Sequence, residues 1–183
     1  MDVGSAGAIA SLNFFQNQFD STVEGIDVVG SYTRNWESGQ RSSAVVSFNT
    51  NAYSIDRVTN PNLFNAASIY NFENNAPDWR STVTLSHDIG KFSGMVRANL
   101  FGPYSRSTTA APILYQNYKT EALWDLELDY KMTDKVTFTV GGRNVTDAYP
   151  PVNVINASNG AIYSDGPVDW QGGYYYGRVN YTF

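Results

Sequence analysis

Three carboxylates spaced two residues apart form the most concentrated set of chemical groups in the chain. Asp125, Glu127 and Asp129 alternate with apolar residues between Trp124 and Met132. A β-strand would carry all three acids on one face, whereas a helix would scatter them. Such a row could supply a general acid–base pair or bind a cation. We favour a simpler interpretation, in which the row lies on a polar sheet face and pairs with arginines of other strands. The arginines expected on that face are Arg97, Arg143 and Arg178.

The other reactive groups do not form a catalytic constellation. His87 is the only histidine, and a Ser-His-acid hydrolase would need it as the base. Its place beside a predicted turn at Asp88 favours a surface or interfacial role. Gly141 and Gly142 fall inside a predicted strand, where glycine marks a bend or a close approach, not a phosphate-binding loop. The sequence has no cysteine and no metal-ligand motif. We therefore expect no enzymatic activity, no metal and no cofactor.

Composition limits the classes of protein to which the chain can belong. It has 183 residues, enough for one domain, with 16% charged and 15% aromatic residues and a formal net charge of −5. This balance suits a barrel with an apolar outer band and aromatic girdles. With 12 Lys and Arg and no basic stripe, we expect no nucleic-acid partner. No apolar run reaches the roughly 18 residues of a transmembrane helix.

Alternation of apolar and polar residues predicts an all-β chain with about eight antiparallel strands. Three segments lack alternation and are predicted as long loops, at 55–77, 102–117 and 150–171. Residues 63–70 of the first loop are compatible with a helix. The predicted strands span 8–16, 22–36, 42–53, 78–88, 92–101 and 118–132, followed by one that begins at Val136 and a closing strand over 172–183.

Connection lengths predict how the strands are arranged. Counted back from Phe183, longer loops alternate with tight turns at 133–135, 88–91 and 37–40. Transmembrane β-barrels segregate their connections in this way, with short periplasmic turns and long extracellular loops. We therefore predict an antiparallel transmembrane β-barrel with 55–77, 103–117 and 148–171 outside the cell. Aromatic residues at the predicted strand ends would form its girdles: Trp36, Trp79, Phe92, Tyr130, Tyr175 and Phe183.

Such strands cannot leave an edge unpaired in lipid, because exposed N–H and C=O groups find no water there. Two arrangements satisfy this requirement. Either about eight strands close on themselves as a small barrel, or they pair with strands outside the chain.

Two C-terminal segments resemble a known protein family. The first spans 136–150 and ends in Gly-Gly-Arg-Asn-Val-Thr-Asp-Ala-Tyr-Pro, and the second is the closing run over 172–183, which ends on Phe183. Together they resemble the last strands of TonB-dependent outer-membrane receptors. Thr146 departs from the pattern, since many members carry Phe there. The resemblance is most specific over 119–183 and extends more loosely back to about residue 20.

The resemblance implies that residues 1–183 are the C-terminal part of a receptor barrel of roughly 22 strands, without its plug domain, TonB box or signal peptide. Such a receptor imports a scarce nutrient, of the siderophore, vitamin or oligosaccharide class, across the outer membrane of a Gram-negative bacterium. Its expected partners are outer-membrane lipid, the missing plug and barrel strands, the barrel-assembly machinery, and the TonB complex through the plug alone. By the same resemblance, the assembly signal of the closing strand falls on Tyr181 and Phe183.

Loop aromatics are the candidate ligand contacts, because loops carry binding in barrels. Their rings could stack on sugar or siderophore rings, although loop packing and girdle anchoring would account for them too. Two other classes of protein also fit the sequence. One is a self-contained small outer-membrane barrel with a structural or adhesive role, and the other is a soluble secreted β-sandwich that binds glycans. The candidate ligand contacts are Tyr70, Phe72, Tyr104, Tyr115, Tyr149 and Tyr163.

Overall fold

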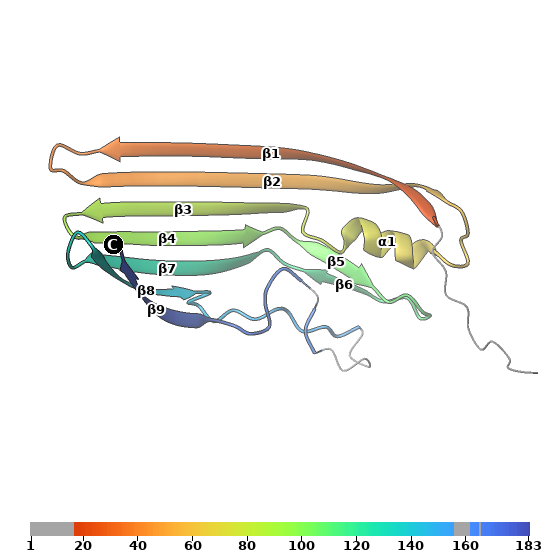
Figure 1. The fold of residues 1–183 in the computed structure, drawn as a ribbon. Helices are drawn as coiled ribbons and strands as arrows, with labels where there is room; N and C mark the ends of the chain where they lie inside the picture. The colour runs from red at the N-terminus through yellow and green to blue at the C-terminus, as the bar shows by residue number, and fades with distance from the viewer. Residues whose placement is uncertain (1–16, 156–161, 165) are drawn as a thin grey trace, which may run out of the picture.

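The alternating segments fold into one antiparallel sheet whose seven strands follow chain order (Figure 1). The computed structural model describes residues 17–155, 162–164 and 166–183. Two further strands, β5 (Tyr104–Ser107) and β6 (Tyr115–Tyr118), pair with each other as a separate hairpin. The sheet strands are β1 (Phe19–Asn35), β2 (Arg41–Val58), β3 (Trp79–Ile89), β4 (Phe92–Phe101), β7 (Glu121–Lys131), β8 (Val136–Arg143) and β9 (Tyr174–Tyr181).

The two-residue period of the strands separates apolar from polar side chains on opposite faces of the sheet. The register keeps this separation across the strands, since Val46 faces Val83 and Leu128 faces both Gly94 and Val140. We call the side of the sheet that carries these apolar side chains the apolar face. Its large side chains are exposed, so no layer of the described residues covers this face. They include Ile26, Val28, Tyr32, Val46, Phe48, Leu85, Val96, Trp124, Leu126, Leu128, Val140, Tyr175 and Val179.

The other side, which we call the polar face, carries hydroxyls, amides and charges. Asp27 accepts a hydrogen bond from Asn49 Nδ2 (2.6 Å), and Thr82 Oγ1 donates to Asn99 Oδ1 (3.4 Å). Such pairs link neighbouring strands, because the register sets polar side chains directly opposite one another. The alternation predicted from the sequence is therefore confirmed. The face also includes Ser47, Thr84, Arg97, Asp125, Glu127, Asp129, Thr139, Tyr176 and Arg178.

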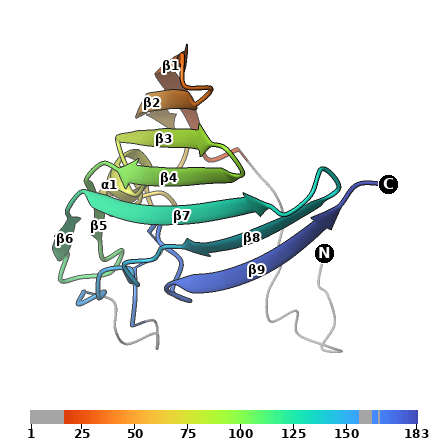
Figure 2. The ribbon, with the colours of Figure 1, turned by 90° about the vertical axis from the view of Figure 1, so that its left-hand side faces the viewer.

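The sheet is open, and β1 and β9 form its two opposite edges in both ribbon views (Figures 1 and 2). Within the described residues no pairing joins these two strands. β1 is exposed over almost its whole length of 17 residues. The prediction of an antiparallel β-fold is confirmed, and seven of the eight predicted strands are present in the sheet. The strand predicted at 8–16 lies outside the described residues.

Connections of different length lie at opposite ends of the sheet (Figure 1). The turns after β1, β3 and β7 are short and lie at what we call the short-turn end. The connections after β2, β4 and β8 are long and lie at the loop end, together with the helix and the β5–β6 hairpin. Thr182, just after β9, donates its backbone N–H to Lys135 O (2.9 Å) at the short-turn end. The predicted segregation of loop lengths is confirmed.

The first long connection starts later than predicted. The β1–β2 ribbon runs to Val58, where a loop was expected from residue 55, because the helix α1 (Ala66–Asn74) packs beside it. Glu73 Oε1 of α1 accepts a hydrogen bond from the Ile55 backbone N–H (2.9 Å). The helix overlaps the predicted 63–70 but starts three residues later, because Asn65 caps it by accepting from the Ser68 backbone N–H (3.0 Å). No helix among the described residues is long and apolar enough to cross a membrane.

The second long connection was predicted as a loop over 102–117, and this prediction is wrong in part. It contains β5 (Tyr104–Ser107) and β6 (Tyr115–Tyr118), which are joined by stacking of Tyr104 on Tyr118 (ring centroids 4.5 Å apart). Strands of four residues are too short for alternation to reveal. Tyr118, predicted as the start of a long strand, therefore belongs to β6, and β7 begins at Glu121.

Candidate functional site

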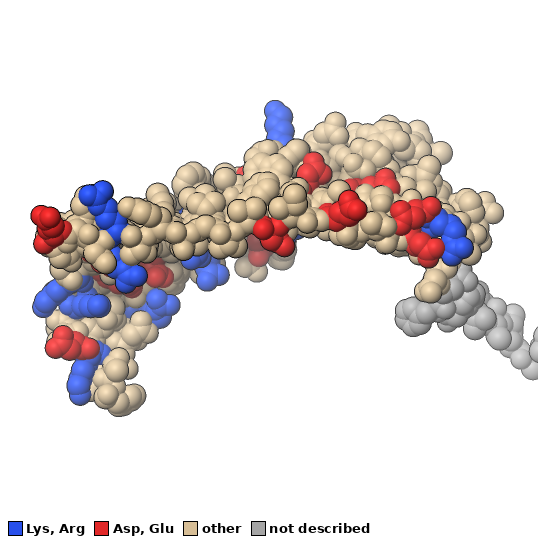
Figure 3. Space-filling view, turned by 90° about the horizontal axis from the view of Figure 1, so that it is seen from above, with Lys and Arg blue, Asp and Glu red and all other residues tan. Residues whose placement is uncertain are grey.

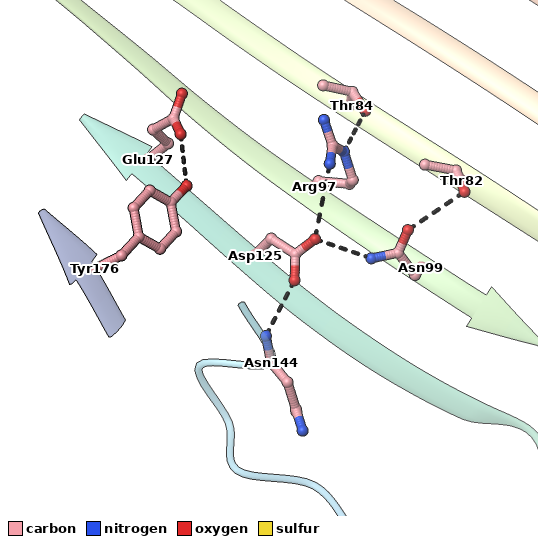
Figure 4. Close-up of polar contacts among 8 residues, drawn as sticks. All are labelled: Thr82, Thr84, Arg97, Asn99, Asp125, Glu127, Asn144 and Tyr176. Carbon is pink, nitrogen blue, oxygen red and sulfur yellow. Dashed lines mark hydrogen bonds and ion pairs between the residues drawn. The ribbon is translucent and has the colours of Figure 1, made fainter. Parts of the chain in front are cut away.

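The carboxylate row of β7 lies on the polar face, and Asp125 is its most connected member (Figure 4). One carboxylate oxygen, Oδ2, accepts from Asn99 Nδ2 (3.1 Å) and lies 3.9 Å from Arg97 Nη1 on β4. The other, Oδ1, accepts from the backbone N–H of Asn144, just after β8 (3.0 Å). Asp125 is only 8% exposed. Its charge is thus balanced by an arginine, and its oxygens are occupied by donors from two other segments.

The other two acids have partners on β8 and β9. Glu127 Oε2 accepts from the Tyr176 hydroxyl (2.5 Å) and lies 3.6 Å from Arg178 Nη2. Asp129 accepts from the hydroxyl of Thr139, which is almost fully buried. The predicted pairing with arginines is present at Arg97 and Arg178. The third predicted arginine, Arg143, instead lies 5.9 Å from the ring centroid of Tyr174. Together these contacts tie four strands into one polar wall.

A tight turn after β8 holds the start and end of the third long connection together. Asn144 and Asp147 both have a positive φ, 48° and 53°, which their short polar side chains tolerate. The Asn144 side chain makes two hydrogen bonds to Ala148: Nδ2 donates to the Ala148 carbonyl (2.7 Å), and Oδ1 accepts from the Ala148 backbone N–H (3.0 Å). Asp147 Oδ1 accepts from Gly173 N–H, just before β9 (2.9 Å). Sequence reasoning missed this role, although Asn and Asp spaced three apart after a strand are a turn signal.

The two strand glycines lie where tyrosine rings approach the backbone. A Cβ on Gly141 would lie 2.6 Å from the Tyr176 ring, and one on Gly142 would lie 2.8 Å from the Tyr175 ring. The close approach predicted for this pair is confirmed. It allows Tyr176 to reach across β8 to Glu127 on β7.

A cavity of about 430 Å³ opens on the polar face beside Asp125, toward the loop end. It lies against Arg97 on β4, against Arg143 and Asn144 at the end of β8, and against the last residues of the third long connection. Its size falls in the range of about 300–1,000 Å³ typical of small-molecule sites. Both cationic and acidic groups line it, so it suits a polar ligand or a polar protein segment. The lining side chains include Arg97, Asn99, Asp125, Arg143, Asn144, Asp169, Gln171 and Tyr174.

The predicted ligand-contacting aromatics all lie at the loop end, but in separate pairs. Tyr70 of α1 meets Tyr115 of β6 edge-on (4.9 Å between centroids), and Tyr149 stacks near Tyr163 (6.2 Å). Phe72 packs against Phe19, at the start of β1 (5.0 Å).

Tyr104 differs from the other candidates, because it is buried. Its ring stacks on Tyr118, and its hydroxyl shares a hydrogen bond with Ser164 Oγ (2.8 Å). Its place is in the packing of the loop end. Tyr115 and Tyr149, by contrast, are exposed there.

Two tyrosines at the loop end have a raised pKa. Burial raises the pKa of the Tyr104 hydroxyl and outweighs the Ser164 hydrogen bond, which lowers it. The negative charge of Asp147 raises the pKa of Tyr149. Both hydroxyls therefore stay protonated to a higher pH than a tyrosine in water, and both can still donate hydrogen bonds.

Replacing Asn71 by alanine should loosen the contact between α1 and the β5–β6 hairpin. Asn71 Nδ2 donates to Ser107 O (2.9 Å), and Oδ1 accepts from Ser107 N (2.7 Å), so one side chain satisfies both backbone groups of a buried residue. Losing these hydrogen bonds lowers the local stability of the contact between the helix and the hairpin by about 1–3 kcal/mol. Amide hydrogen exchange in the hairpin should accelerate, while exchange in the sheet stays unchanged.

The matched control is Asn74→Ala in the same helix, where Nδ2 donates only to the Tyr70 carbonyl one turn back (2.8 Å). Equal exchange rates in the two variants would show that Asn71 does not hold the hairpin.

His87 of β3 lies outside the carboxylate row. It points to the apolar face near the short-turn end, and its Nδ1 lies 2.8 Å from Ser42 Oγ. Among the described residues no three His, Asp or Glu side chains are grouped as metal ligands. Comparison of the chain with protein-family models, curated proteins and solved structures found no match.

Proposed function

We propose that this chain is a barrel-wall segment of a TonB-dependent outer-membrane receptor, and that the complete receptor imports a scarce nutrient of the siderophore, vitamin or oligosaccharide class. The observation that carries the proposal is the exposed apolar face, which is backed by a hydrogen-bonded polar face across seven strands. A soluble monomer rarely leaves so large an apolar surface open to water. In lipid the same surface is stable, while the polar face lines a wet or plugged interior.

The open edges support a segment of a larger barrel. Each edge strand has a row of backbone N–H and C=O groups on its outer side, and lipid offers these groups no partner. Pairing with preceding strands at β1, and with the first strand of the complete barrel at β9, would satisfy both rows. Seven strands would then form about a third of a barrel of roughly 22.

The two ends of the sheet receive different roles in this proposal. The loop end faces the outside, so that Tyr70, Phe72, Tyr115, Tyr149 and Tyr163 lie where a nutrient first binds. The polar face turns inward, toward the plug that the receptor family places in its barrel. TonB acts on that plug and supplies the energy of import. The segment's own partners are outer-membrane lipid, the rest of the receptor and the barrel-assembly machinery.

The two alternatives need arrangements that differ from the open sheet. A small barrel closed by the seven described strands needs β1 to pair with β9, and these strands lie at opposite edges of the sheet. A glycan-binding β-sandwich needs a second sheet over the apolar face. The second sheet found in the described residues is the β5–β6 hairpin at the loop end. The receptor segment is therefore the proposal that the geometry supports best.

The direct test is the intact mass of the natural polypeptide in an outer-membrane fraction, with its heat-modifiable mobility in gels. We expect a mass several times the 20.3 kDa of this chain, and a faster band before boiling than after. A mass near 20.3 kDa in that fraction would favour the small barrel. Monodisperse protein in the soluble fraction would favour the sandwich.

Deleting Phe183 from the complete protein should lower its yield in the outer membrane. Phe183 is exposed and packs edge-on against Tyr181 (5.1 Å between centroids), so the pair presents an aromatic end to the closing strand. In the receptor family the assembly machinery recognises this end. Quantitative blotting of membrane fractions measures the yield. Phe183→Tyr, which keeps the ring, is the control, and an unchanged yield after deletion would contradict the assigned role.

A further inference from the structure

One polar cluster interrupts the apolar face near the short-turn end. Trp36 Nε1 donates to Ser42 Oγ (3.0 Å), and Ser42 Oγ lies 2.8 Å from His87 Nδ1. The Arg34 guanidinium lies over the Trp36 ring, 3.9 Å from its centroid. These four residues, which we call the Arg34–His87 cluster, come from β1, the turn after it, β2 and β3. Arg34, Ser42 and His87 stand in one cross-strand row, because each is paired with the next in the register.

The hydrogen bonds of this cluster leave a donor for a ligand. Because Trp36 donates to Ser42, the Ser42 hydroxyl hydrogen can point at His87 Nδ1. In that tautomer Nε2 carries the ring hydrogen. The exposed Arg34 and His87 side chains then both present N–H groups on the apolar face near the short-turn end. Such a pair of donors fits a phosphate group.

An apolar groove begins directly beside His87. It has a volume of about 920 Å³ and continues across β4, β7 and β8 to Tyr175 on β9. Gly94, which is paired with His87, forms the floor of the groove at this point. A Cβ at Gly94 would meet nothing within 4 Å, so the space above it is open. Leucine, valine and glycine line most of the groove. The side chains and backbone along it include Leu85, Val96, Leu126, Leu128, Val140 and Gly142.

Charge at the short-turn end favours an anionic occupant. In the space-filling view Lys and Arg gather at this end of the molecule (Figure 3). Five cationic residues lie in or beside the three short turns, namely Arg34, Arg41, Lys91, Lys131 and Lys135, against three acidic ones, Glu37, Asp88 and Asp134. The whole chain, by contrast, has a net charge of −5. An amphiphile with an anionic head and apolar chains would match both the charge and the groove.

We propose that this site binds one molecule of an anionic glycerophospholipid, with its phosphate on Arg34 and His87 and an acyl chain in the groove over Gly94. The inference rests on the proposed function, since it needs the apolar face to lie in the membrane. The inference adds that one position on the apolar face retains a single lipid molecule, whereas the rest of that face contacts lipids without selecting among them. The lipid belongs to the leaflet that meets the short turns.

The test uses the natural polypeptide purified from outer membranes, exchanged into mild detergent and titrated with dioleoyl phosphatidylglycerol in native mass spectrometry. One lipid should bind to the wild type with higher affinity than any that follow. Gly94→Leu, which fills the groove, and Arg34→Gln, which removes the cation, should each weaken that first binding about tenfold. Gly30→Leu is the matched control, because Gly30 lies on the same face in open space but not in the groove.

Two further comparisons make the outcome decisive. Dioleoylglycerol, which has the chains without the phosphate, should bind wild type and Arg34→Gln equally. Equal phosphatidylglycerol binding by wild type, Gly94→Leu and Arg34→Gln, all heat-modifiable, would overturn this inference alone. A wild type without heat-modifiable mobility would remove the proposed function and this inference together.

Discussion

Replacing Val46 by arginine should prevent the complete protein from accumulating in the outer membrane, whereas replacing Val45 should not. The two valines are neighbours in the middle of the part of β2 that pairs with β3, and their side chains are almost equally exposed, at 43% for Val46 and 42% for Val45. They differ in the face on which they lie. Val46 stands opposite Val83 on the apolar face, and Val45 stands opposite Thr84 on the polar face. An arginine on the lipid face near the middle of the membrane costs about 2–4 kcal/mol.

Outer-membrane yield and heat-modifiable mobility measure the effect, with Val46→Leu as a control for size. Because the two valines are almost equally exposed, exposure alone would give the two arginine variants the same yield. A difference in yield between them therefore reports what surrounds each face. Equal loss in Val46→Arg and Val45→Arg would mean that both faces are packed against protein. Equal tolerance would mean that both faces meet water.

Replacing Asp125 by alanine should destabilise the sheet by about 2–4 kcal/mol, because the change leaves buried partners without their acceptor. Asn99 Nδ2 and the Asn144 backbone N–H would lose their hydrogen bonds, and Arg97 would lose the carboxylate that lies 3.9 Å from its Nη1. Asn144 starts the positive-φ turn that joins β8 to its loop, so the turn should loosen as well. Urea unfolding in lipid vesicles, followed by tryptophan fluorescence, measures the loss.

Asp129→Ala is the control from the same row, where the contact is a single hydroxyl on the neighbouring strand. We expect a loss of about 1 kcal/mol or less there. Asp125→Asn should fall between the two, because it keeps an acceptor for Asn144 but not the charge beside Arg97. Equal losses in Asp125→Ala and Asp129→Ala would show that the Asp125 network adds nothing to stability.

Alternation was sufficient to predict the sheet, because a period of two is a local property of each strand. It placed Asp125, Glu127 and Asp129 on one face and predicted their arginine partners, two of which are present. It predicted β4 with its observed bounds of Phe92–Phe101. It failed at the β5–β6 hairpin, where two short strands depend on the stacking of Tyr104 on Tyr118. It also ended β2 too early, since β2 continues there beside α1.

The finer geometry of the site depends on residues that no local pattern brings together. Asp125 and Asn144 are separated by 19 positions, and Glu127 and Tyr176 by 49. Gly141 permits the second of these contacts, because the Tyr176 ring crosses where its side chain would be. The Arg34–His87 cluster joins three strands in the same way. Sequence could predict which face each residue occupies, but not which neighbours the register would give it.

The most direct test of the central claim, that the apolar face meets lipid, is nitroxide spin labelling of single cysteines. The chain has no cysteine of its own, so each introduced label is specific within it. Labels at Val28, Val46 and Val140 on the apolar face, and at Val29, Val45 and Thr137 on the polar face, would be compared in outer-membrane vesicles. We predict frequent collisions with dissolved oxygen, and few with a nickel chelate, at the first three positions only. High nickel accessibility at Val28, Val46 and Val140 would contradict the account, because it would place the apolar face in water.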